Sequence, residues 1–166
     1  MNLQFYLEKL FASESFQNFV KEKTDAYFCS GFFCVDKKGK DNKTHIDYYV
    51  PSEDKIFSFQ LESKIEPMPV DVIEKETPEK IPDNLDFNFN EIENIIKEKM
   101  QVEKINNKIE KVLLSLQRVD KKDFLVGTIF ISGLGMIKVK VDLDKIEITE
   151  FEKKSFFDMV KVLKKN

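Results

Sequence analysis

The sequence predicts an α+β fold. It contains two helix-strand-strand-strand (αβββ) units that form antiparallel sheet, with helices packed on one face and a further helix at the C-terminus. Segments 26–35 and 123–132 have apolar residues at both odd and even positions, so both faces of each predicted strand are apolar. This pattern is typical of a central strand covered by other parts of the chain. Short polar turns and further strand-like segments follow each of them, and short connections between successive strands indicate an antiparallel meander.

The first unit is predicted over residues 1–62 and begins with two short helices. Leu3, Leu7 and Leu10 share one helical face, whereas Phe16 and Phe19 fall nearly opposite. We therefore expect a break near residues 12–15, where Ser13 or Ser15 can cap the second helix. Strands are then predicted over 26–35, 44–50 and 55–61.

The amino-acid composition changes in residues 63–87. This segment contains four of the five prolines, with acidic residues between them. We interpret this segment as a linker or an extended surface segment. Residues 70–73 could add an edge strand. One hypothesis for residues 66–82 is that they fold back and bind weakly to a surface of the same chain that otherwise binds a partner. The alternative is that they form a solvated connector.

The second unit is predicted over residues 88–166. Val102, Ile105, Ile109, Val112 and Leu116 keep a 3-4-3-4 rhythm, which predicts a single core-facing helix over 89–118. Asn90 with Glu93 is compatible with a capping arrangement at its start. Strands follow over 123–132, 137–141 and 145–151, and Ser155 with Asp158 can cap a final helix.

The order of elements in the two units suggests an internal repeat. Phe28-Cys29-Ser30-Gly31 aligns with Phe124-Leu125-Val126-Gly127, so Gly31 and Gly127 are expected at equivalent places. The halves could join into one six-stranded sheet or pack as two layers. In element order alone, such tandem units resemble PepSY-like and cystatin-like small domains; this resemblance concerns shape and carries over no functional residue.

The composition argues against several classes of protein. The chain has 166 residues and a net charge of −3, with Arg118 as its one arginine, so a specific nucleic-acid surface or a site of several arginine clamps is not expected. No apolar run reaches the roughly 18 residues of a membrane helix, and no secretory signal is visible at the start. We expect no membrane partner.

The cysteines and the single histidine limit the metal chemistry. Cys29 and Cys34 lie five positions apart in one predicted strand, so their side chains are expected on opposite faces and cannot bridge each other. Free buried thiols favour a reducing, cytoplasmic location. With one histidine and two cysteines, we predict no metal site.

The sequence lacks a phosphate-binding loop, a nucleophile elbow and a zinc-protease motif, so we predict neither a catalytic residue nor a cofactor. His45, Asp47 and Tyr49 lie on one side of the predicted strand 44–50 and are the candidate ligand-binding residues. The alternative is that they form the solvated face of that strand.

Two functions are favoured, and nucleic-acid contact by the Lys-rich C-terminal half is a weaker third option. We expect a small non-enzymatic cytosolic protein that binds another protein or a peptide on a sheet face, a sheet edge or a helix groove. The alternative is an enzyme or small-ligand binder with a pocket between the two halves.

Overall fold

The computed structural model of the protein describes residues 1–71 and 76–164. Its helices are α1 (Leu3–Phe11), α2 (Glu14–Glu22), α3 (Phe89–Val102) and α4 (Phe156–Lys164). The strands of the first half are β1 (Tyr27–Asp36), β2 (Lys43–Val50), β3 (Lys55–Gln60) and β4 (Met68–Val70). Those of the second half are β5 (Ile109–Val119), β6 (Lys122–Ile131), β7 (Gly135–Asp142) and β8 (Glu147–Ser155).

All eight strands form one sheet in the order β4-β3-β2-β1-β5-β6-β7-β8, and every neighbouring pair is antiparallel. The predicted α+β class and the antiparallel sheet are confirmed. The two halves meet where β1 pairs with β5, from Gly31 opposite Leu116 to Asp36 opposite Lys111. They therefore share one sheet and do not form separate layers.

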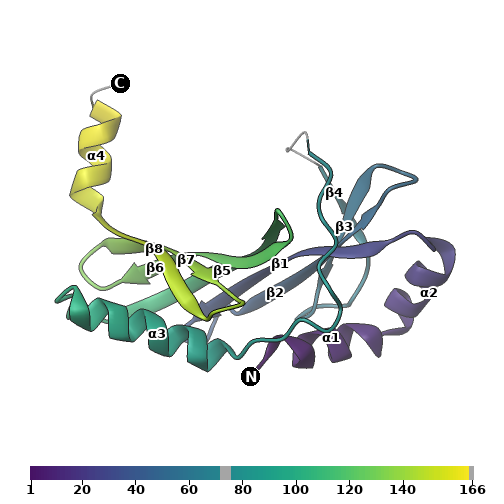
Figure 1. The fold of residues 1–166 in the computed structure, drawn as a ribbon, viewed down its shortest axis with the longest axis horizontal. Helices are drawn as coiled ribbons and strands as arrows, with labels where there is room; N and C mark the ends of the chain where they lie inside the picture. The colour runs from purple at the N-terminus through teal and green to yellow at the C-terminus, as the bar shows by residue number, and fades with distance from the viewer. Residues whose placement is uncertain (72–75, 165–166) are drawn as a thin grey trace.

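Three helices lie along one side of this sheet, as Figure 1 shows for α1, α2 and α3. Their buried side chains, among them Leu7, Phe16 and Ile96, belong to a single hydrophobic core with alternate residues of the strands, such as Ile46 and Ile129. Burying this apolar surface is the main term that stabilises the layered arrangement. Figure 1 also shows α4 rising away from the sheet at the end of β8.

Side-chain caps begin the helices. The side chain of Asn2 accepts a hydrogen bond from the Phe5 backbone N–H, and that of Ser13 accepts one from Phe16, which confirms the predicted break between α1 and α2. The cap of α3 is Asn88, two residues before the predicted Asn90. Before α4, Ser155 and Asp158 exchange hydrogen bonds as predicted.

The single helix predicted over 89–118 is wrong. Helix α3 ends at Val102, Lys104 adopts a left-handed backbone conformation with φ of 56°, and the chain then enters strand β5. The second half therefore has four strands after its helix instead of three. In strand order, Gly31 lies on the first strand of its half and Gly127 on the second, so the expected equivalence of these glycines fails.

The first half also has a fourth strand, the short edge strand β4. It was expected over residues 70–73 and lies over Met68–Val70, where Met68 pairs with Ser58 and Val70 with Ile56. Residues 72 and 73 of that prediction lie outside the described residues.

The two cysteines do not lie on opposite faces of the sheet. A bulge between Phe28 and Ser30 adds a residue to β1 and changes the alternation. Cys29 and Cys34 are both buried, both are outside the hydrophobic core, and both line hollows on the sheet surface opposite α1, α2 and α3. Within the described residues, no helix has the length and apolarity needed to cross a membrane.

Candidate functional site

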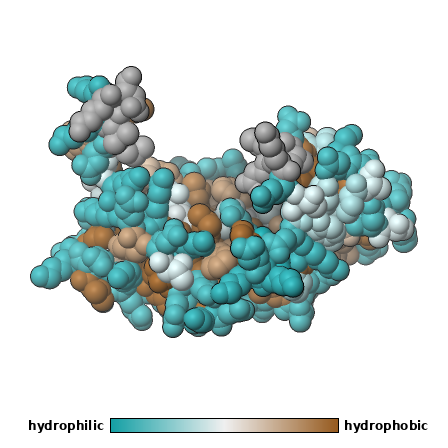
Figure 2. Space-filling model, turned by 45° about the horizontal axis from the view of Figure 1, so that its top comes forward, coloured by the Kyte–Doolittle hydropathy of each residue, from teal (hydrophilic) through white to brown (hydrophobic). Residues whose placement is uncertain are grey.

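The sheet surface opposite α1, α2 and α3 is the strongest candidate for a functional surface, and we call it the open face. No described helix packs across it (Figure 1). Figure 2 shows apolar atoms exposed on this side of the molecule, next to α4. A large antiparallel sheet usually buries one face and exposes the other to water, so apolar residues on the second face indicate a contact surface.

An apolar band crosses three neighbouring strands of the open face. Phe32 on β1, Leu113 on β5 and Phe130 on β6 line the same hollow. Val126 also belongs to this band. It lies on β6 opposite Ser115, two positions from the residue that pairs with Leu113, and 39% of its surface is exposed. These residues alternate with core residues along each strand, so the pleat itself turns them outward.

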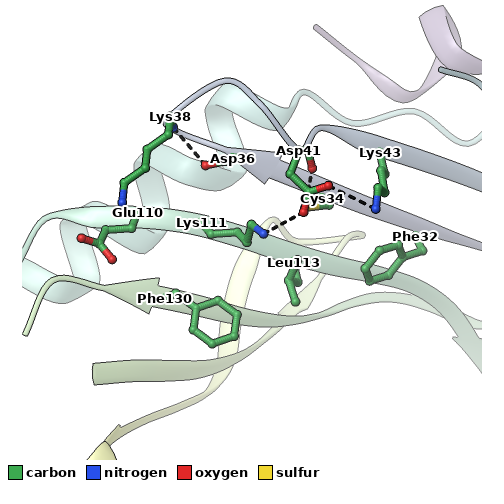
Figure 3. Close-up of a pocket in the computed structure, with 10 residues that line it drawn as sticks. All are labelled: Phe32, Cys34, Asp36, Lys38, Asp41, Lys43, Glu110, Lys111, Leu113 and Phe130. Atoms are coloured by element: carbon green, nitrogen blue, oxygen red, sulfur yellow. Dashed lines mark hydrogen bonds and ion pairs between the residues drawn. The ribbon is translucent and has the colours of Figure 1, made fainter. Parts of the chain in front are cut away.

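Phe32, Leu113 and Phe130 form the floor of a hollow of about 680 Å³ beneath the turn between β1 and β2 (Figure 3). Asp41 crosses its rim and bridges Lys111 at 2.9 Å and Lys43 at 3.1 Å. Hydrogen bonds from Lys111 and then Lys43 lower the pKa of Asp41. The hollow thus combines an apolar floor with a charged rim, which suits an apolar side chain carried on a polar main chain.

The Cys34 thiol lies in this hollow but is not activated as a nucleophile. Its Sγ donates a hydrogen bond to the Asp41 carbonyl oxygen at 3.1 Å. Burial raises the pKa of Cys34, more than the nearby Lys111 lowers it. A raised pKa keeps the thiol protonated at neutral pH, and the thiolate is the reactive form.

The three sequence-predicted site residues all lie on the open face, but they do not converge on one point. The His45 ring contacts Ser58, with Nδ1 3.3 Å from Oγ. Asp47 accepts a hydrogen bond from Ser30 at 2.7 Å, and the Tyr49 hydroxyl donates one to Asp54 at 2.6 Å. Each side chain has a different partner, so the three residues do not form one shared binding or catalytic site.

Asp47 is the most unusual of the three. Its Oδ1 atom is buried and makes no hydrogen bond to any residue that the structure describes. The Cys29 thiol donates to the Asp47 carbonyl oxygen at 3.4 Å. Burial, followed by the charge of Asp47, raises the pKa of Cys29 to about 12, which keeps this thiol protonated as well.

Residues 76–81, which we call the strap, close the other end of the open face. Pairing between β1 and β5 stops at Gly31 and Leu116, although both strands continue past this point, and the strap lies in the resulting gap. Tyr27 donates its hydroxyl to the Pro78 carbonyl at 2.6 Å, and the Ile81 N–H donates to the Phe28 carbonyl at 2.8 Å.

The strap passes from the open face into the core. Glu79 accepts a hydrogen bond from the Lys121 backbone N–H at 3.1 Å, and Ile81 is completely buried. A second hollow of about 310 Å³ lies between the strap and the sheet, lined by Ser30, Ser115 and Gln117 among others. The hypothesis that residues 66–82 cover a partner surface points to a contact of this kind, but it did not indicate the burial of Ile81; the one signal for that burial was an isoleucine placed directly before Pro82 in an acidic segment.

A further hollow of about 230 Å³ lies on the helix side, between the two halves. Tyr6, Thr44 and Glu62 line it from the first half, and Phe89 and Glu93 from the second. Burial raises the pKa of Glu93, but hydrogen bonds and charges from Lys37 and Lys97 outweigh this effect and leave it lowered. His45, Asp47 and Tyr49 do not line this hollow, because they lie on the opposite side of the sheet.

Over residues 1–71 and 76–164, no group of His, Cys, Asp and Glu side chains is arranged to hold a metal ion. No protein-family model matches the chain, and no curated protein matches it. A crystal structure described as "a putative lipoprotein" from Clostridium difficile 630 has a similar fold, with a TM-score of 0.55 and 14% sequence identity. The similarity covers 83% of this chain and 89% of that one, and at this identity it shows the fold alone.

Proposed function

We propose that the protein is a non-enzymatic module that binds another protein or a peptide on its open face. The observation that carries this proposal is the apolar band of Phe32, Leu113, Val126 and Phe130 beside a hollow with a charged rim. An extended peptide can place alternate side chains in such a hollow while its main chain meets polar groups. Both thiols have raised pKa values, which also favours binding over nucleophilic catalysis.

Selection of peptides from a random displayed library, followed by calorimetry on the best synthetic peptide, tests this proposal. Leu113→Glu places a charge in the apolar band and should weaken binding at least about tenfold, which corresponds to roughly 1.4 kcal/mol. Leu134→Glu is the matched control, because Leu134 is 70% exposed in the turn after β6. Equal affinity for both variants and the unchanged protein would place binding elsewhere and overturn the proposal.

A small-ligand site between the two halves is the second candidate. The helix-side hollow supports it, because residues of both halves line it and Tyr6, Thr44 and Glu62 offer polar groups. Its volume of about 230 Å³ is below the roughly 300–1,000 Å³ of common ligand sites. We therefore favour the open face.

We also propose that the two halves repeat one unit of helix and four strands, with the helices packed on one face. The strand order runs outward from β1 in one half and from β5 in the other. If Phe33 is matched with Leu114, the registers match Ile46 with Ile129 and Phe59 with Ile137, and all six residues are buried. A better superposition of the two halves in any other register would refute the repeat.

A cytoplasmic location is proposed from the two free, buried cysteines. Fractionation of cells that express the full-length protein with a C-terminal tag tests it, and recovery in a membrane or secreted fraction would exclude it. We propose no specific nucleic-acid site, since Lys138 and Lys140 lie opposite Glu152 and Glu150 in the sheet. Retention of RNA or DNA that depends on sequence at physiological salt would contradict this.

A further inference from the structure

The two edges of the sheet differ sharply. Strand β4 is three residues long and has Pro69 at its centre, which cannot donate a main-chain hydrogen bond. Strand β8 is nine residues long, with a bulge at Thr149 that leaves residues 150–155 as its regular part, and no described strand pairs with its outer edge. An edge of this length presents a row of main-chain N–H and C=O groups that another strand can use.

We propose that β8 pairs with β8 of a second copy, antiparallel across a two-fold axis, so that the sheet continues from one copy into the other. The charges along the strand carry this inference. Glu147, Glu150 and Glu152 precede Lys153 and Lys154, so the first part of β8 is acidic and its end is basic. Antiparallel self-pairing brings the acidic part of each copy beside the basic end of the other.

The alternation of the sheet limits the registers open to this pairing. Glu150, Glu152 and Lys154 lie on the open face, since their partners on β7 are Lys140, Lys138 and Met136. Residues directly opposite each other in an antiparallel pair share a face. With Glu152 on the two-fold axis, Glu150 of each copy lies opposite Lys154 of the other, which gives two favourable charge pairs.

Other registers are less favourable. A shift that puts Phe151 on the axis places Glu150 opposite Glu152 twice, which brings like charges together. The opposite shift puts Lys153 on the axis and pairs Glu152 with Lys154 twice, but it brings the two Lys153 ammonium groups together, and Lys153 lies opposite the apolar Ile137 on β7. In the chosen register only the two Glu152 carboxylates meet. Each has a Lys154 ammonium 3.8 Å away on its own strand and Lys138 opposite it on β7, so cations flank the pair.

Edge charges often protect a sheet from pairing with any strand. The acidic and basic side chains of β8 are unfavourable next to most other strands, but they are complementary to a second β8 in the antiparallel direction. These charges therefore favour β8 of a second copy as the partner. The path to the edge is also open, because α4 begins at Phe156, directly after the strand, and rises away from the sheet (Figure 1). The partner that fits this edge is therefore a second copy of the chain.

Charge reversal tests the register. Sedimentation equilibrium of the full chain should show a dimer that forms as concentration rises. Glu150→Lys and Lys154→Glu should each weaken it at least about tenfold, because each change replaces two attractive pairs with two like-charge pairs. The double variant Glu150→Lys/Lys154→Glu should restore dimerisation. Glu91→Lys, on the exposed surface of α3, carries the same charge change and should have no effect.

A cysteine on the two-fold axis gives an independent test. Opposite residues of antiparallel strands have Cα atoms about 4.5–5.5 Å apart, within the range that a disulfide spans. Glu152→Cys should therefore form a disulfide-linked dimer in air, whereas Glu103→Cys at the exposed end of α3 should not. A wild-type chain that stays monomeric at millimolar concentration, or a double variant that stays as weak as the single ones, would overturn the proposal.

Discussion

The Tyr27 hydroxyl donates a hydrogen bond of 2.6 Å to the Pro78 carbonyl, and this contact joins the first residue of β1 to a segment 51 positions further along the chain. It places the strap at the end of the open face. The strap has few main-chain bonds to the sheet, because Pro78 has no N–H to donate. Side-chain contacts such as this one therefore largely determine how firmly it is held.

Tyr27→Phe should loosen the strap without unfolding the domain. Loss of this hydrogen bond is expected to cost about 1 kcal/mol of unfolding free energy. Amide hydrogen exchange should rise over residues 76–81 and in the turn at Lys121, whose N–H bonds to Glu79. Tyr6→Phe, on the helix side, is the control and should leave exchange in the strap unchanged. Equal exchange in both variants would mean that Tyr27 does not hold the strap.

Stability should fall as pH rises above about 9 because of Cys29. Its pKa is about 12 in the folded protein against an ordinary 9.0, so in this window the unfolded chain releases a proton that the folded chain keeps. Proton release from the unfolded state alone lowers the free energy of unfolding as pH increases. Below pH 9 both states hold the proton, and Cys29 makes no pH-dependent contribution. Urea titrations from pH 7 to 11 should show a shallower decline for Cys29→Ala than for the unchanged protein.

Ser30 should matter more for stability than His45. Asp47 already has one buried oxygen without a described partner, and Ser30→Ala removes the donor to the other oxygen at 2.7 Å. We expect a loss of about 1–3 kcal/mol, the usual cost of leaving a buried acceptor unsatisfied. His45→Ala should change stability by less than about 0.5 kcal/mol, as ordinary surface substitutions do. A reversed order in urea unfolding would identify His45 as the structurally important member of the pair.

Gly127→Ala should destabilise the protein more than Gly31→Ala. A Cβ atom at Gly127 would lie 2.8 Å from Leu114 and 2.9 Å from Val139, and the Leu113 carbonyl is 3.2 Å away. Such overpacking between three central strands costs about 1–3 kcal/mol. At Gly31 the nearest atoms belong to the Phe33 ring, at 3.1 Å, and a ring at the end of a side chain can move. Thermal unfolding of the two variants compares them directly.

Much of the sheet was predictable because its strands are short and locally patterned. Ile46, Tyr48 and Val50 point into the core and His45, Asp47 and Tyr49 point away from it, as the alternation indicates. Strand β5 was missed for a physical reason. Its core residues Val112, Leu114 and Leu116 alternate as in a strand, but Val102, Ile105, Ile109, Val112 and Leu116 also fit a helical spacing.

The candidate site was only partly predictable. The side of β2 that carries His45, Asp47 and Tyr49 was correctly placed, but their partners Ser58, Ser30 and Asp54 come from other segments, and sequence spacing does not indicate them. The apolar band depends on the register between β1, β5 and β6, which could not be derived while β5 was assigned to a helix. The burial of Ile81 depends on a gap between β1 and β5 that no local pattern shows.

The short junction between β1 and β5 has a consequence for folding kinetics. Every other strand pair joins neighbours in sequence, whereas this junction links residues roughly 80 positions apart, such as Gly31 and Leu116. Closing so large a loop costs entropy before any contact compensates for it, so the two meanders should form first and join late. Pulse-labelling hydrogen exchange should then protect the amides of β6 and β7 before those that bond across the junction. Val112→Ala, in the junction opposite Val35, should mainly accelerate unfolding and leave the refolding rate nearly unchanged.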